Sequence, residues 1–309
     1  MITSLFRKST PLNYSLVVIG VVVFFFLYQI HTISGNNSGG NLIEKFVIFV
    51  TLFVSIFTAN FIIKKNGLSK DSAYTVLFYF IFLLFFPSLW DNLNLVLSNF
   101  FVLLAFRRLV SMQSLKVPKE KIFDASLWIF VATLFHFWSI LYILLVFIAI
   151  LFHVARDYRN WFLPFIAFFT TAFIYLFFAL IFNKSWITNL VSQAVVDYKI
   201  NYFVAISQNL ALSIYATIGL FFVFSLVLSM SNRPLILHSS YKKIISAFFI
   251  GILVFIVSPN KSNDLLVFTI APLAMMATCH IEIAQIKWQK EVALAFLILS
   301  GFIAFFAQL

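Results

Sequence analysis

The sequence predicts an all-α protein, a polytopic bundle of transmembrane helices that forms a single domain over residues 1–309. Of the 309 residues 63% are hydrophobic and 10% are charged, whereas roughly a quarter of the residues of a soluble domain are charged. Mean hydropathy is +1.05, and the polar stretches between apolar runs are only as long as loops. A soluble domain of any size is therefore excluded, and nearly all of the chain is expected in the bilayer or at its surface.

About eleven apolar runs are long enough to cross the hydrocarbon core, which takes roughly 20 helical residues. Polar or turn-forming residues bound most of these runs and mark the ends of the helices. The expected helices cover residues 14–32, 43–63, 72–89, 92–110, 123–138, 139–155, 161–182, 209–231, 243–258, 264–286 and 291–309.

The basic residues predict the orientation of these helices. If the N-terminus lies inside, the cytoplasmic side holds seventeen of the 21 Lys and Arg residues, and the outer side keeps only Lys45, Lys184, Lys199 and Lys261. Cytoplasmic loops are enriched in Lys and Arg, so the sequence predicts an N-in/C-out topology. The net charge of +11 is thus a topology signal, and its spread in twos and threes argues against nucleic acid as a partner.

The run at 123–155 contains two crossings with almost no polar break between them. Lys121 and Arg156 both favour the cytoplasmic side, so the chain must cross the membrane twice between them. We expect a tight hairpin whose tip, residues 135–138, lies at the outer interface, where Trp is enriched.

Two further segments are expected at the outer face. Residues 183–209 place apolar side chains at three- and four-residue steps, which predicts an amphipathic helix on the outer membrane face or, alternatively, a packed re-entrant segment. Residues 258–285 begin with a polar turn and continue as an apolar run that contains Pro272. This run predicts a membrane helix in which neighbouring helices compensate for the missing backbone donor.

Several kinds of chemistry are disfavoured by what the sequence lacks. The single cysteine, Cys279, lies in an apolar run and is expected to be an inert packed thiol, which excludes an internal disulfide and a cysteine metal cluster. The five histidines have no metal-binding spacing, so no metal site is predicted from them. The sequence also has no Walker lysine loop and no GxSxG motif.

Four acidic residues face outward in this topology, and each lies near a membrane boundary. They are Glu44, Asp91, Asp197 and Asp264. A carboxylate in that position can meet a substrate at the outer face. The alternative is helix capping, because Glu44, Asp91 and Asp264 all begin expected helices, and an acid in the first turn complements the helix dipole.

Residues 100–110 (FFVLLAFRRLV), the hairpin at 130–147 and residues 258–278 (SPNKSNDLLVFTIAPLAMMAT) carry a resemblance to a known family. These segments, and the order of features along the chain, are similar to the GT-C superfamily of membrane glycosyltransferases, which use polyprenyl-phosphate-linked sugars. The resemblance implies a GT-C-like helix arrangement, a site at the outer face, and a polyprenyl-phosphate-linked sugar among the membrane lipids that the protein contacts.

The resemblance also implies roles for individual residues. Glu44 would match the acid of the first outer loop, which binds a metal or the acceptor, and Asp91 would match the second acid, so both are candidate catalytic residues. An outward carboxylate would act as a base or hold a divalent cation near the acceptor hydroxyl. The candidate substrate-binding residues are His136 at the hairpin tip, Lys199 and Lys261 on the phosphate, and Asp264.

Two departures from the family pattern leave the function open. The first outer loop is short and has no Asp-x-Asp, and Asn263-Asp264 stands where Arg-Tyr is common. The whole chain also resembles an uncharacterised family of inner-membrane proteins in Bacteroidota. This second resemblance implies a location in the bacterial inner membrane, and it gives no information about activity. Three hypotheses follow in order: a binder or transferase of a polyprenyl-phosphate-linked sugar, a non-enzymatic subunit of an envelope complex with membrane-protein partners, and a transporter.

Overall fold

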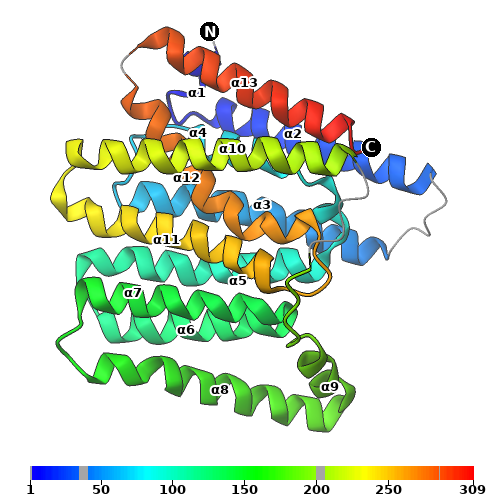
Figure 1. The fold of residues 1–309 in the computed structure, drawn as a ribbon, viewed down its shortest axis with the longest axis vertical. Helices are drawn as coiled ribbons and strands as arrows, with labels where there is room; N and C mark the ends of the chain where they lie inside the picture. The colour runs from blue at the N-terminus through cyan, green and yellow to red at the C-terminus, as the bar shows by residue number, and fades with distance from the viewer. Residues whose placement is uncertain (1, 35–40, 200–205, 285) are drawn as a thin grey trace.

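The computed structural model describes residues 2–34, 41–199, 206–284 and 286–309. Throughout these residues the chain forms helices and short connections, without a strand. Figure 1 shows the helices lying side by side in one bundle, with their axes roughly parallel. The predicted all-α fold class is therefore confirmed.

Eight helices of the described chain are long and apolar enough to cross a membrane. They are α2 (Pro11–Ser34), α3 (Leu42–Lys65), α5 (Leu93–Val110), α8 (Arg159–Phe182), α10 (Ile206–Ser229), α11 (Leu235–Val257), α12 (Val267–Ile283) and α13 (Lys287–Phe306). Large apolar side chains such as Phe169 and Phe173 are exposed along α8. A continuous apolar surface of this kind is expected to face lipid, and the chain is a multi-pass membrane protein.

Three of the expected crossings correspond to helices that are shorter, or carry more charged residues, than the eight described above. They are α4 (Tyr74–Leu83), α6 (Pro118–Phe135) and α7 (Ile143–His153). In Figure 1 consecutive helices alternate in direction from α2 to α8 and again from α10 to α13. The first and last of these helices, α2 and α13, run in the same direction. About eleven crossings would give this pattern, and the number of crossings and the N-in orientation stay predictions. We call the end of the bundle that holds the loop 258–263 the outer end and the opposite end the inner end.

Short helices connect the long ones, and one of them corrects a predicted boundary. They are α1 (Ile2–Phe6), η1 (Pro87–Asp91), η2 (Ser111–Ser114), η3 (Phe137–Tyr142), α9 (Ser185–Ser192), η4 (Met230–Asn232) and η5 (Asn263–Leu266). The sequence predicts a single helix over 72–89, but α4 ends at Leu83 and η1 follows as a 3₁₀ helix. Pro87 has no N–H and holds Phe86 out of the helical region, at φ −134° and ψ 69°.

The tight hairpin predicted within 123–155 is confirmed. α6 ends at Phe135, His136 is extended with φ −142° and ψ 109°, and η3 starts at the next residue. The following helix α7 packs back against α6. The hairpin therefore turns at a single extended residue.

Within the segment 183–209, predicted as an amphipathic helix, the described residues contain the short helix α9 and the first residues of α10. α9 ends at Ser192, the chain continues without helix to residue 199, and residues 200–205 lie outside the described part of the chain. The backbone N–H of Asp197 donates to the carbonyl of Val257 at 3.3 Å. This hydrogen bond holds the segment against the end of α11, so the backbone donor is not available to an extended α9.

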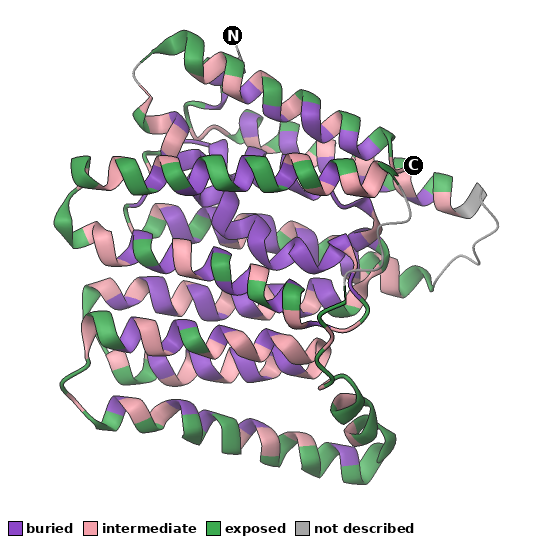
Figure 2. Cartoon of the chain, viewed as in Figure 1, coloured by how far each residue is buried: buried purple, intermediate pink, exposed green. Residues whose placement is uncertain are grey.

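α12 is the centre of the bundle. In the apolar span Asn263–Ile283, which joins η5 to α12, 83% of the most apolar 18-residue stretch is buried, the highest share among the eight candidate spans. The helix packs against α4, α10 and α11, and Figure 2 shows it buried along most of its length. A helix that is apolar on all sides is expected in such a central position.

Pro272 removes one backbone donor from α12, and Tyr142 of η3 supplies another. Because a proline has no N–H, the carbonyl of Phe268, four residues earlier, loses its partner within the helix. The buried Tyr142 hydroxyl lies 3.1 Å from this oxygen and 3.1 Å from the carbonyl oxygen of Ala247 on α11. Gly251 permits the approach, because a Cβ there would lie 3.0 Å from the Tyr142 oxygen. One hydroxyl thus joins η3, α11 and α12.

We expect Tyr142→Phe to lower the free energy of unfolding by about 1–3 kcal/mol, because it leaves the buried carbonyl of Phe268 without its donor. Thermal unfolding in detergent measures the loss. The control is Tyr158→Phe, at a ring that is 67% exposed, where a change of less than about 0.5 kcal/mol is expected. Equal losses in the two variants would contradict the role given to Tyr142.

Candidate functional site

A polar pocket lies at the outer end of the bundle, and we call it the outer pocket. It has a volume of about 240 Å³ and forms where the tip of the α6–η3 hairpin meets the start of α5 and the loop before η5. Phe137 and Trp138 supply aromatic walls. The polar lining consists of uncharged side chains and one histidine: Asn92, Asn94, His136, Gln193, Asn260 and Ser262.

An apolar groove adjoins the outer pocket, and we call it the lipid groove. It has a volume of about 580 Å³ and runs between α6 and α8, with α9 across one end. Its walls include Leu134 of α6, Ile174 of α8 and Leu190 of α9. Phe135 and Gln193 line both the groove and the outer pocket, so the two spaces adjoin at these residues. Figure 1 shows α8 at the edge of the bundle with α9 at its end.

Hydrogen bonds outside the cavity hold the walls of the outer pocket. The Asn92 side chain caps α5 by accepting from the N–H of Leu95 at 3.3 Å. The indole N–H of Trp138 donates to the carbonyl of Val195 at 3.2 Å, which fixes the segment after α9 against the hairpin tip. Asn260 has a positive φ of 49°, a conformation that asparagine tolerates better than most residues.

His136 lies in the wall of the outer pocket in its neutral form. Its Nε2 lies 3.0 Å from the hydroxyl oxygen of Ser258, and that hydroxyl lies 2.6 Å from the carbonyl of Val254, to which it donates. The Nε2 therefore carries the proton and donates to Ser258, which leaves Nδ1 as an acceptor. Burial lowers the pKa of His136 to about 4. At neutral pH the ring cannot hold a phosphate by charge.

The two predicted phosphate-binding lysines have different surroundings. Lys261 is buried, and its ammonium group donates to the carbonyls of Asp197 and Ser258. These bonds close the loop before η5, so this cation is already engaged. Lys199 is exposed, and its backbone N–H donates to the carboxylate of Asp197 at 2.9 Å. Of the two, Lys199 is the cation that a ligand at the outer end can reach.

The structure brings Asp91 and Asp264 into one region. The carboxylate of Asp91 accepts from the amide of Gln29 at 3.1 Å, and both carboxylates lie within electrostatic reach of the Tyr28 hydroxyl. Asp91 does not cap α5, because Asn92 holds that position. The side chain that caps α5 is therefore that of Asn92 and not that of Asp91.

Asp264 joins two short helices instead of facing the outer pocket. It is buried, and its carboxylate accepts from the hydroxyls of Ser88 on η1 and Ser262 before η5. Both carboxylate oxygens are thereby used inside the protein. These contacts give Asp264 a structural role, and its role in substrate binding stays a prediction.

Glu44 lies apart from the outer pocket. It occupies the first turn of α3, where an acid complements the helix dipole, and neither α2 nor α3 contributes a residue to the pocket lining. Of the six candidate residues only His136 lines this cavity. Asp91 precedes the lining residue Asn92, and Asp264 lies two residues after the lining residue Ser262.

The donor set does not fit a divalent cation held by the protein. Within the described ranges no group of three His, Cys, Asp or Glu residues is placed to bind a metal ion. The carboxylates of Asp91 and Asp264 already accept hydrogen bonds from side chains. Hard divalent cations prefer several free oxygen ligands, and these residues do not provide them.

The residues missed by sequence reasoning are uncharged. Asn92 follows Asp91 directly, Asn94 comes two residues later, and Gln193 lies just after α9. Their only signal in the sequence is that amides cluster at the outer ends of apolar runs. Comparison with protein-family models, with curated proteins and with solved structures gave no match to this chain.

We expect the stability of the protein to fall between pH 6.5 and pH 4 in a way that depends on His136. The folded pKa is about 4 against 6.5 for a free histidine, so the unfolded chain binds the proton more tightly and acid favours unfolding. This contribution is present above pH 6.5 and amounts to at most about 3 kcal/mol. In His136→Asn the unfolding midpoint should fall less on acidification than in the wild type. His31→Asn, at an exposed position, should keep the wild-type profile.

Proposed function

We propose that this protein binds a lipid-linked sugar of the polyprenyl-phosphate class at the outer end of the bundle. The observation that carries the proposal is that the apolar groove lies directly beside the polar pocket, with Phe135 and Gln193 in the lining of both. An amphiphile needs these two environments side by side, one for its chain and one for its headgroup.

The lipid groove suits an apolar chain that enters from the bilayer. Its lining is mostly aliphatic and aromatic. One wall is formed by α8, and only 17% of the residues in the most apolar 18-residue stretch of this helix are buried. A helix so little covered by protein meets lipid over most of its surface. An isoprenoid chain therefore has a lateral route into the groove without passing through water.

The outer pocket suits a headgroup rich in hydroxyls. Asparagine and glutamine amides both donate and accept hydrogen bonds, as a sugar requires. Trp138 offers a fixed aromatic wall, and the unprotonated Nδ1 of His136 adds an acceptor. An uncharged lining of this kind fits a neutral sugar better than an ionic headgroup, since buried charge requires a partner.

The phosphate that joins chain and sugar would lie at the mouth of the pocket. Lys199 is the exposed cation on the segment that follows Gln193, and a charge-assisted bond from its ammonium group would hold a phosphate oxygen. Lys261 is positioned to support this segment through the carbonyl of Asp197. Lys199 binds the ligand in this proposal, and Lys261 positions the loop.

Binding without transfer is the form of the proposal that the pocket supports best. Among the described residues that line the outer pocket none carries a carboxylate, and transfer needs a base at the acceptor hydroxyl. Asp91 is the nearest candidate in sequence, since it precedes Asn92. A lipid-linked sugar held without reaction agrees with the alternative of a non-enzymatic subunit of an envelope complex.

Removal of the amides tests the sugar site. We expect the double variant Asn94→Ala/Gln193→Ala to bind a polyprenyl-phosphate-linked hexose at least about tenfold more weakly, because two hydrogen bonds of about 1 kcal/mol each are lost. Binding is measured by native mass spectrometry in neutral detergent. Affinity for the same polyprenyl phosphate without the sugar should change little. Asn232→Ala, at an exposed position of η4, is the control, and an equal loss there would refute the sugar site.

A bulky residue in the groove tests the chain site. Ile174→Trp narrows the lipid groove and should weaken the binding of both polyprenyl phosphates, with and without the sugar, by a similar factor. Phe173→Trp is the matched control, because Phe173 is 74% exposed and does not line the groove. If the Ile174 variant folds and binds both lipids as the wild type does, the chain lies elsewhere.

A further inference from the structure

A second cavity lies at the inner end of the bundle, and we call it the inner pocket. It has a volume of about 410 Å³. Three segments supply cations to its lining: the turn after α1, the loop between α3 and α4, and the first turn of α13. These cations are Arg7, Lys70, Lys287 and Lys290.

The two carboxylates in the inner pocket hold its walls. Glu282 accepts from the N–H of Lys70 at 2.9 Å and from the hydroxyl of Ser72 at 2.7 Å. Glu291 accepts from the backbone N–H of Thr3, at 3.3 Å to each oxygen. These bonds join the loop between α3 and α4 to the end of α12, and α1 to α13.

The charge of the lining is positive. Its four cations and two carboxylates give the lining a net charge of +2. Three ion pairs occur among the described residues, and none of them includes one of these four cations. The lining of the cavity therefore carries more positive than negative charge.

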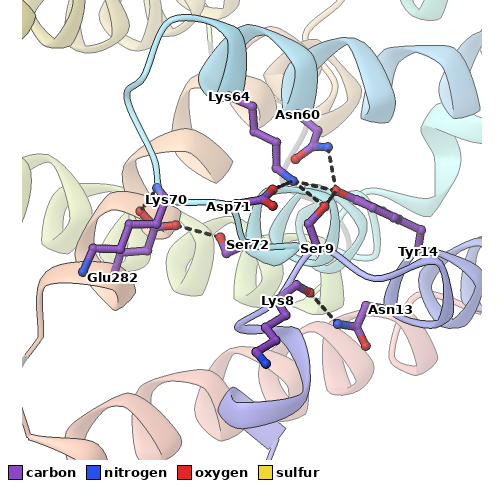
Figure 3. A network of polar contacts seen from close by, with 10 residues as sticks. All are labelled: Lys8, Ser9, Asn13, Tyr14, Asn60, Lys64, Lys70, Asp71, Ser72 and Glu282. Carbon is purple, nitrogen blue, oxygen red and sulfur yellow. Dashed lines mark hydrogen bonds and ion pairs between the residues drawn. The ribbon is translucent and has the colours of Figure 1, made fainter.

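A polar network outside the inner pocket fixes two of the segments that carry the cations (Figure 3). The amide of Asn13 donates to the carbonyls of Leu5 and Lys8 at 2.6 Å each, which holds the turn that contains Arg7. The ammonium group of Lys64 contacts Ser9, Tyr14 and Asp71 at 2.6–2.8 Å.

The same network reaches the loop that contains Lys70, because Asp71 is its next residue and is paired with Lys64 at 2.8 Å. Figure 3 shows Lys70, Ser72 and Glu282 beside this network. The positions of Arg7 and Lys70 are thus set before any ligand arrives, which lowers the cost of binding.

We propose that the inner pocket binds a phosphate-bearing anion. Basic residues are expected at the cytoplasmic end of a membrane protein, but that bias places them in loops and does not gather four of them around one cavity. A guanidinium and several ammonium groups are the donors that phosphate oxygens accept from most strongly. The headgroup of an anionic phospholipid and a soluble phosphate share this chemistry, and the site is independent of the proposed sugar-lipid site.

The test measures the unfolding midpoint of the full chain in neutral detergent against added phosphatidylglycerol, phosphatidylcholine or inorganic phosphate. We expect phosphatidylglycerol or inorganic phosphate to raise the midpoint, and the gain to shrink as salt is added. The variant Lys70→Gln/Lys290→Gln should require at least about tenfold more ligand for the same gain. Lys65→Gln/Lys116→Gln removes the same charge from residues that do not line the inner pocket and should respond as the wild type does.

Each outcome decides the proposal. A gain from phosphatidylglycerol alone assigns the site to a lipid headgroup, and a gain from inorganic phosphate assigns it to a soluble anion. Equal gains from phosphatidylcholine and phosphatidylglycerol, with none from inorganic phosphate, would show that charge is not recognised and would overturn the proposal. The same conclusion follows if the control variant loses as much response as the pocket variant.

Discussion

Burial of a proline-containing helix at the centre of the bundle is the constraint on which the other elements depend. α12 can be buried there only if the carbonyl freed by Pro272 finds a donor, and Tyr142 supplies it. Tyr142 ends η3, six residues after His136, while the turn before α12 contributes Asn260 and Ser262 to the outer pocket. The bond that completes the core therefore also positions the two walls of the proposed sugar site.

Much of the fold follows from the sequence because it depends on long apolar runs and on charge alternation. Those signals predict the long helices, the hairpin at residue 136 and the turn before α12. Local exceptions need tertiary information: Pro87 divides the run at 72–89, and the bond from Asp197 to Val257 ends the regular structure after α9. Lys243 is a further case, since it counts as an inner-side cation but is buried, with its ammonium group 2.6 Å from the carbonyl of Leu109.

The candidate site was harder to predict, because charged residues draw attention and the cavity is lined by uncharged ones. A charge close to the membrane must be paired or hydrogen-bonded. Lys261 and Asp264 meet that requirement with partners inside the protein and so serve the architecture. An uncharged amide carries a smaller penalty and can stay open to a ligand, but Asn94 and Gln193 look like ordinary boundary residues in the sequence. The two ends of the bundle thus differ, with neutral groups around one cavity and cations around the other.

The position of α8 at the edge of the bundle affects the rate at which a bound lipid can leave. Among the eight candidate spans it has the smallest buried share, and it packs mainly on α6 and α7, with α9 at its end. Little protein surface must separate for α8 to move outward and release what lies behind it. The dissociation rate of a bound lipid would then be set by this one helix rather than by opening of the core, so residence time and affinity can be tuned by different parts of the chain.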